Sequence, residues 1–251
     1  MLFSYTSMHP GVVPLLVIYF ILIGFGSYII KKMYDKWQER DNPLPLYLGL
    51  VFLALIIALC FLAIGLVETI ITRYFKEIYR ITFPLAYVMV VIADILLFKF
   101  TNEITNRRGR ILYLITVIGI GIIILLLLPW NWWGVPSKDY TGQLSIRLYS
   151  TLIFTLYSVV IYLSIAIISL KARGKAKERK TKFGFLLYAL SVLCMVAFFV
   201  TNVMENVLIV FFDHPGYSIF VYIGWVFAFL FIILSYLSLV MPKWLTDRLN
   251  L

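Results

Sequence analysis

The chain has 251 residues, of which 63% are hydrophobic and only 14% are charged. Soluble domains are apolar in about half of their residues, so this composition excludes a soluble globular protein. A net charge of +10 is common in nucleic-acid-binding proteins, but the positions of the basic residues along this chain indicate a different reason for the charge.

Seven apolar runs of membrane-spanning length follow one another along the chain. A helix needs about 20 such residues to cross a hydrocarbon layer about 30 Å thick. The runs cover residues 11–30, 46–71, 81–100, 111–130, 148–170, 183–212 and 218–241. Because backbone groups have no water to bond within the bilayer core, each run is expected to be an α-helix. The sequence predicts an all-α polytopic membrane protein, one seven-transmembrane-helix bundle over residues 1–251.

The basic residues indicate the orientation of this bundle. Most of the 22 lysines and arginines lie in or beside the segments that follow the first, third, fifth and seventh runs. The positive-inside rule then predicts an N-terminus outside and a C-terminus in the cytoplasm, in a multi-pass protein of the cell membrane. Bases beside helix ends lie at the depth of anionic headgroups. We therefore expect contacts with anionic lipids at the cytoplasmic face, and no binding of nucleic acid.

The most basic segment joins the fifth and sixth runs. Its bases are Lys171, Arg173, Lys175, Lys177, Arg179, Lys180 and Lys182, and its one acid is Glu178. A solvated segment against lipid headgroups is the simple expectation, and docking of an acidic cytoplasmic signalling partner is the alternative.

Polar residues gather near the expected outer ends of the second and sixth runs. Glu68 lies near the end of the second run and Arg73 follows it, while Asn202 shares one helix face with Glu205 and Asn206, which are three and four residues farther along. An ionisable group in a membrane is costly unless it faces the bundle interior or water. We predict that these five residues line a ligand-binding pocket open to the outside. The alternative is a cluster of hydrogen bonds between helices.

Asp94 is the acid expected to lie deepest in the membrane. It follows about 14 residues of an inward-running helix, which at about 1.5 Å per residue places it in the inner third of the bilayer. Ser164, Tyr188, Ser191 and Ser235 have similar expected depths on three other runs. We predict a polar inner cluster around Asp94 that acts as an intramembrane switch. A proton site or simple packing are the alternatives.

Signatures of catalytic or cofactor chemistry are missing from the sequence. His9 and His214, the only histidines, fall outside the apolar runs, and the run 218–241 has no lysine to hold a retinal. Cys60 and Cys194 fall inside runs, where no oxidising compartment would pair them. There is no Gly-rich phosphate loop and no serine nucleophile elbow. We expect no metal, no cofactor, no structural disulfide and no enzymatic activity.

Three features carry a resemblance to a known class of proteins. They are the seven runs with short connections, the basic segment between the fifth and sixth runs, and the exit sequence Met241-Pro242-Lys243-Trp244-Leu245. Across the whole chain these features resemble the seven-helix membrane sensor domains of microbial histidine kinases and stand-alone archaeal seven-span membrane proteins. The resemblance implies a receptor-like protein that passes an outward or in-membrane signal to a cytoplasmic partner. A signalling module normally follows such domains, so beyond Leu251 the output is expected to pass through a partner or another module.

Two other functions stay open. Seven spans suit a small-solute or proton-coupled transporter built as three plus one plus three helices, but central turns such as 117–128 are almost purely apolar and the two triplets are not clearly similar. A non-catalytic membrane scaffold or complex subunit would show small residues at close-packing spacing. Gly24 and Gly26, like Gly119 and Gly121, are two residues apart instead of four. The receptor-like role is the leading prediction.

Overall fold

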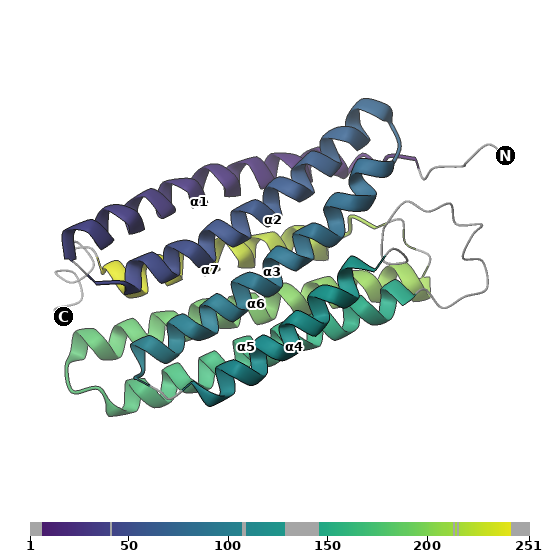
Figure 1. Ribbon diagram of the computed structural model, residues 1–251. Coiled ribbons are helices and arrows are strands. Elements are labelled where there is room, and N and C mark those ends of the chain that lie inside the picture. Colours follow the sequence, from purple (N-terminus) through teal and green to yellow (C-terminus); the bar gives the residue numbers. More distant parts are fainter. Residues whose placement is uncertain are drawn as a thin grey trace.

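Seven long helices run up and down along one common direction (Figure 1). The computed structural model describes residues 7–40, 42–106, 109–128, 146–212, 214 and 216–241. The helices are α1 (Val12–Arg40), α2 (Leu44–Thr72), α3 (Glu77–Ile104), α4 (Arg110–Leu127), α5 (Ile146–Lys175), α6 (Arg179–Phe212) and α7 (Ile219–Val240). Each is long and apolar enough to cross a membrane, which confirms the all-α prediction and the seven predicted spans.

Most helices are longer than the apolar runs that predicted them. α5 has 30 residues and α6 has 34, which at about 1.5 Å per residue exceeds a hydrocarbon layer of about 30 Å. The surplus in both helices includes the basic residues at the turn between them. α4 is the shortest helix, with 18 residues, and its expected last residues, Pro129 and Trp130, lie outside the described residues.

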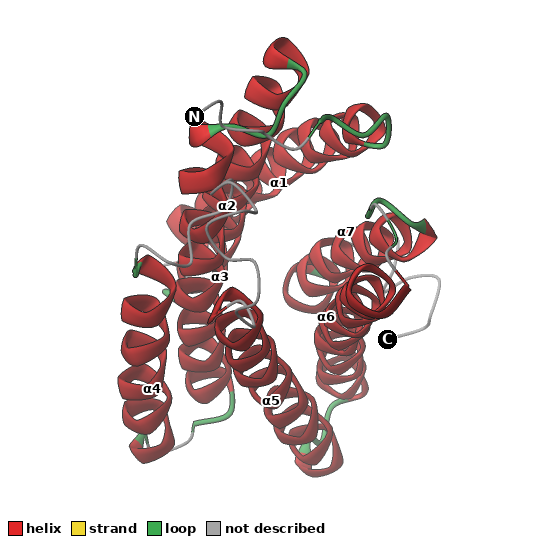
Figure 2. Cartoon of the chain, turned by 90° about the vertical axis from the view of Figure 1, so that its right-hand side faces the viewer, coloured by secondary structure: helices red, strands yellow, loops and turns green. Residues whose placement is uncertain are grey.

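The helices are arranged in sequence order around a ring (Figure 2). Each helix packs against its neighbours in the chain, and α1 meets α7 to complete the ring. α3 packs against α2, α4 and α5, so α3 and α5 are neighbours in the ring and α4 lies outside it, against both. In this arrangement, a shift of α3 would change its packing against three other helices.

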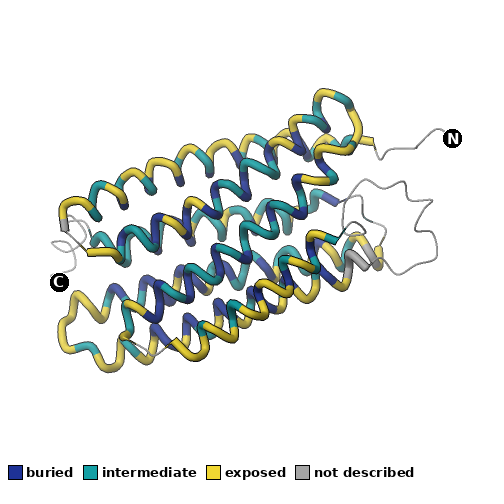
Figure 3. Tube along the Cα trace, viewed as in Figure 1, coloured by how far each residue is buried: buried dark blue, intermediate teal, exposed yellow. Residues whose placement is uncertain are grey.

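Large apolar side chains cover the outside of the bundle as well as its interior. Exposed positions follow the outer sides of the helices (Figure 3), and they include Phe20, Ile118 and Leu156. Soluble proteins rarely expose such continuous apolar surface, but a bilayer covers it without cost. Inside, Phe231 of α7 meets Phe52 of α2 with ring centroids 6.1 Å apart. The chain is a multi-pass membrane protein.

The two ends of the bundle differ in charge, and we name them accordingly. The N-terminal end is where α1, α3, α5 and α7 begin, and the basic end is where α2, α4 and α6 begin. All seven bases between the fifth and sixth spans, from Lys171 to Lys182, are exposed at the basic end. Their exposure agrees with a solvated segment, and it leaves them accessible to headgroups or to a partner.

Candidate functional site

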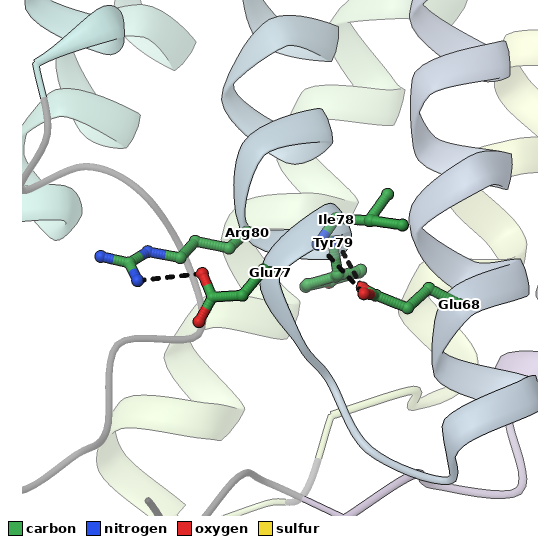
Figure 4. Close-up of polar contacts among 5 residues, drawn as sticks. All are labelled: Glu68, Glu77, Ile78, Tyr79 and Arg80. Atoms are coloured by element: carbon green, nitrogen blue, oxygen red, sulfur yellow. Dashed lines mark hydrogen bonds and ion pairs between the residues drawn. The ribbon is translucent and has the colours of Figure 1, made fainter.

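The carboxylate of Glu68, near the end of α2, holds the start of α3 (Figure 4). It accepts hydrogen bonds from the backbone N–H groups of Ile78, at 3.2 Å, and Tyr79, at 2.8 Å. The first N–H groups of a helix have no partner within the helix and form its positive end, so a carboxylate is well placed there. Glu68 therefore acts as an interhelical cap. The neighbouring pair of Glu77 and Arg80, 3.1 Å apart, lies on the surface of α3.

Glu205 makes the same kind of contact between α6 and α7. It is only 6% exposed. Its carboxylate accepts a hydrogen bond from the backbone N–H of Ser218 at 3.1 Å and another from the Ser218 hydroxyl. The Ser218 hydroxyl oxygen in turn accepts from the N–H of Phe220 at 3.2 Å, as an N-cap residue does. In two places, then, a glutamate near the end of one helix fixes the beginning of the next.

The other predicted pocket residues make local contacts. The side-chain amide of Asn202 donates to the carbonyl of Phe198 at 2.8 Å, and that of the exposed Asn206 donates to the carbonyl of Asn202, also at 2.8 Å. Arg73 is exposed and ends α2 with a left-handed φ of 63°. Within the described part of the chain, no hydrogen bond or ion pair joins Glu68 to Glu205. Only Glu68 and Glu205 bond from one helix to the start of the next, whereas the two asparagines bond within α6, and the ligand pocket stays a prediction.

A segment that the hydropathy pattern did not mark, residues 7–11, crosses the N-terminal end. On one side the N–H of Met8 donates to the carbonyl of Arg73 at 2.9 Å. On the other, the ring of His9 stacks on Tyr217, with centroids 5.2 Å apart and planes 4° from parallel. Burial raises the pKa of Tyr217, and nearby tyrosines and Glu205 add to the rise, so its phenol stays protonated. This segment links the α2–α3 connection to the α6–α7 connection.

Asp94 lies fully inside the bundle, at the contact of α3 with α5. Its side chain is 0% exposed. One carboxyl oxygen, Oδ2, accepts a 2.6 Å hydrogen bond from the hydroxyl of Ser158. The other, Oδ1, makes no hydrogen bond of standard geometry among the described residues, and the phenol of Tyr162 is the hydrogen-bonding neighbour of this carboxyl. The phenols of Tyr157 and Tyr162, both on α5, are its electrostatic neighbours.

The hydroxyl groups that were expected around Asp94 are placed elsewhere. The hydroxyl of Tyr188 is 2.7 Å from that of Thr101, and this contact joins α6 to α3. The hydroxyl of Ser235 donates to that of Ser191 at 3.0 Å, which joins α7 to α6. These hydrogen bonds do not include Asp94, and the cluster around Asp94 and its role as a switch stay a prediction.

Ser164 does not belong to this cluster at all. It lies on an exposed face of α5 and donates to the carbonyl of Val160, one turn back on its own helix, at 2.7 Å. Its inclusion was wrong because similar depth does not imply the same helix face. The residue that does bond Asp94 is Ser158, which the sequence analysis missed.

Neither a metal centre nor a disulfide is found in the described part of the chain. No group of three or more His, Cys, Asp or Glu side chains there is placed to hold an ion, and both cysteines are free. Searches against protein-family models, curated proteins and solved structures found no match. The function must therefore be argued from the geometry of the polar groups inside the bundle.

Proposed function

We propose that this chain is a receptor-like membrane protein that passes an outward or in-membrane signal to a partner at its basic, cytoplasmic end. The observation that carries the proposal is the fully buried Asp94 of α3, whose carboxyl accepts a hydrogen bond from Ser158 and neighbours the phenol of Tyr162, both on α5. Ionisable groups inside a membrane are rare and usually functional.

The position of α3 suits it to be the moving element of such a receptor. Glu68 holds its start, Ser158 holds Asp94 farther along, and Tyr188 holds Thr101 two turns beyond Asp94. These three contacts reach α2, α5 and α6. A ligand shifts a conformational equilibrium only by binding one arrangement more tightly than the other. In our proposal, a ligand changes the contact of α3 with α5, and α6 moves in response.

The movement would reach the basic end through α6. This helix begins at Arg179, beside the exposed bases of the α5–α6 turn, and its Tyr188 contacts α3. A change at Tyr188 therefore displaces a strongly positive surface at the membrane boundary. Such a surface suits an acidic cytoplasmic protein, whose binding would report the signal.

The experiment measures this movement directly. Spin labels are attached at Glu103→Cys on α3 and Lys182→Cys on α6, both exposed at the basic end, in protein whose two native cysteines are replaced by alanine. The distribution of label-to-label distances in liposomes is compared between the parent protein and Asp94→Asn. We expect the populations to shift in Asp94→Asn and not in the control Asp35→Asn on α1. Identical distributions in all three proteins would overturn the proposal.

The same buried carboxyl also favours a second candidate, a proton-coupled transporter. Carboxyl groups inside a bundle serve as proton carriers in such proteins. Flux of small solutes into proteoliposomes under a proton gradient, lost in Asp94→Asn, would favour transport over sensing. A shift of the spin-label distances with no flux favours the receptor.

A further inference from the structure

A groove runs along the outside of the bundle where the first and last helices meet. Its volume is about 180 Å³. α1 contributes Ile18, Ile21 and Leu22, and α7 contributes Trp225, Val226 and Phe229. Ile21 and Val226 are each 58% exposed, so the groove opens to the surface that faces lipid.

Aromatic ring edges form the contact between the two helices beneath this groove. The indole of Trp225 meets the ring of Tyr19 edge-on at 4.7 Å, and the ring of Phe229 meets that of Phe25 at 5.0 Å. Tyr222 lines the groove at its N-terminal end, where its hydroxyl donates to the carbonyl of Gly11 at 3.1 Å. The hydroxyl of Tyr222 thus already has a partner.

We infer that this groove is a binding site for one hydrocarbon chain of a membrane lipid. It lies about 9 to 15 Å along α1 from Val12, at about 1.5 Å per residue, and so within the hydrocarbon layer. A cavity of about 10–15 Å³ holds one water, so a groove of about 180 Å³ has room for a stretch of several methylene groups. A helix, about 10 Å across, does not fit.

The lining also argues against a partner helix. Helices approach closely in membranes where small residues form the surface, whereas the walls here are isoleucine, leucine, valine and aromatic side chains. A water-soluble ligand would find almost no polar surface in this lining. A flexible hydrocarbon chain needs none, and it fills the space between bulky side chains through dispersion contacts.

A hydrocarbon chain in this groove would contact Trp225, the α7 residue that begins a series of packed aromatic rings leading into the bundle. The ring of Trp225 packs against that of Phe198 on α6, with centroids 5.1 Å apart. The rings continue inward from Phe198 to Phe199 and from Phe199 to Tyr162, with centroid distances of 5.4 and 5.9 Å. Tyr162 is the electrostatic neighbour of Asp94. The hydrocarbon chain is therefore the ligand class that we assign to the receptor, and this second step rests on the proposed function.

Photochemical labelling tests the binding site. The protein is placed in liposomes that contain a phosphatidylcholine with a diazirine at the middle of one acyl chain, and labelled peptides are mapped after irradiation. We expect labelling of residues 18–22 and 222–229 to exceed several-fold that of the exposed face of α4. Ile21→Trp fills the groove and should remove this excess. Ile124→Trp on α4 is the matched control, because Ile124 is 59% exposed and Ile21 58%.

Even labelling of all lipid-facing helices, unchanged in Ile21→Trp, would overturn the site and leave only bulk lipid. Val226→Phe fills the groove from the opposite wall and serves if Ile21→Trp does not yield a monodisperse protein. The spin-label distances between α3 and α6 are then measured in the filled variant. A shift of these distances supports the assignment of the lipid hydrocarbon chain as the ligand. Specific labelling without a shift overturns that assignment alone, and the Asp94→Asn comparison still decides the proposed function.

Discussion

The hydroxyl of Tyr222 on α7 donates a hydrogen bond to the backbone carbonyl of Gly11, just before α1, across a sequence separation of 211 residues. This contact fastens the first helix to the last at the N-terminal end. There is little room around it, because a Cβ atom on Gly11 would lie 2.6 Å from Cβ of Tyr217 and 2.9 Å from the Tyr222 hydroxyl. Glycine is required here by close approach.

We predict that Gly11→Ala weakens this closure. The added methyl group forces the backbone away from Tyr217 and Tyr222, at a cost of about 1–3 kcal/mol for overpacking. Thermal unfolding in detergent should show a lower Tm. Gly24→Ala is the matched control, since a Cβ atom there meets nothing within 4 Å and its Tm should not fall. Equal Tm values for the two variants would mean that the N-terminal segment does not hold the helices together.

Glu205 should contribute more to stability than its neighbours on α6. We predict that Glu205→Ala destabilises the protein by about 1–2 kcal/mol, because the N–H and hydroxyl of Ser218 lose their acceptor. The exposed Asn206→Ala should change stability by less than about 0.5 kcal/mol. A double-mutant cycle with Ser218→Ala checks the contact, and additive effects of the two substitutions would argue against it.

The cap by Glu68 has a local signature. In Glu68→Gln the helix start loses its charged acceptor, so we predict faster hydrogen exchange at the amides of Ile78 and Tyr79, with little change farther along α3. Glu77→Gln removes only an exposed ion pair and should leave these two amides as slow as before. Unchanged exchange in Glu68→Gln would mean that the carboxylate is not the group that protects them.

The helices were predictable because hydropathy over about 20 residues suffices to identify a span. Their ends were not, since helical geometry continues into the charged sequence near Lys175 and Arg179, where no membrane limits it. Lysine and arginine are good helix formers, so the apolar run ends before the helix does.

The polar contacts needed information that depth alone does not supply. The contact of Asp94 with Ser158 depends on the rotation of α3 relative to α5, which the sequence does not give. The caps by Glu68 and Glu205 depend on how the α2–α3 and α6–α7 connections fold back, because the amides that they bind lie beyond those turns. Their positions along the apolar runs placed both glutamates toward the outer ends of their helices, but did not identify the groups that they bind.

A substitution of Asp94 separates a switch from a packing contact at this position. We predict that Asp94→Leu, which keeps the branched shape of the side chain, leaves stability unchanged or raises it by about 1 kcal/mol or more, because a buried ionisable group is replaced by an apolar one of similar shape. The spin-label populations at the basic end should at the same time collapse to one. Unfolding with increasing SDS measures the first effect, and the distance distribution measures the second.

Ser158→Ala is the complementary variant. It leaves the buried carboxyl without its hydrogen-bond donor, so we expect a loss of about 1 kcal/mol, the size of a hydrogen bond between membrane helices. Opposite signs for Asp94→Leu and Ser158→Ala mean that Asp94 is retained in spite of its effect on stability, as a functional group is. If Asp94→Leu instead destabilises the protein as much as Ser158→Ala does, the carboxyl contributes to packing, and the switch at the α3–α5 contact must be abandoned.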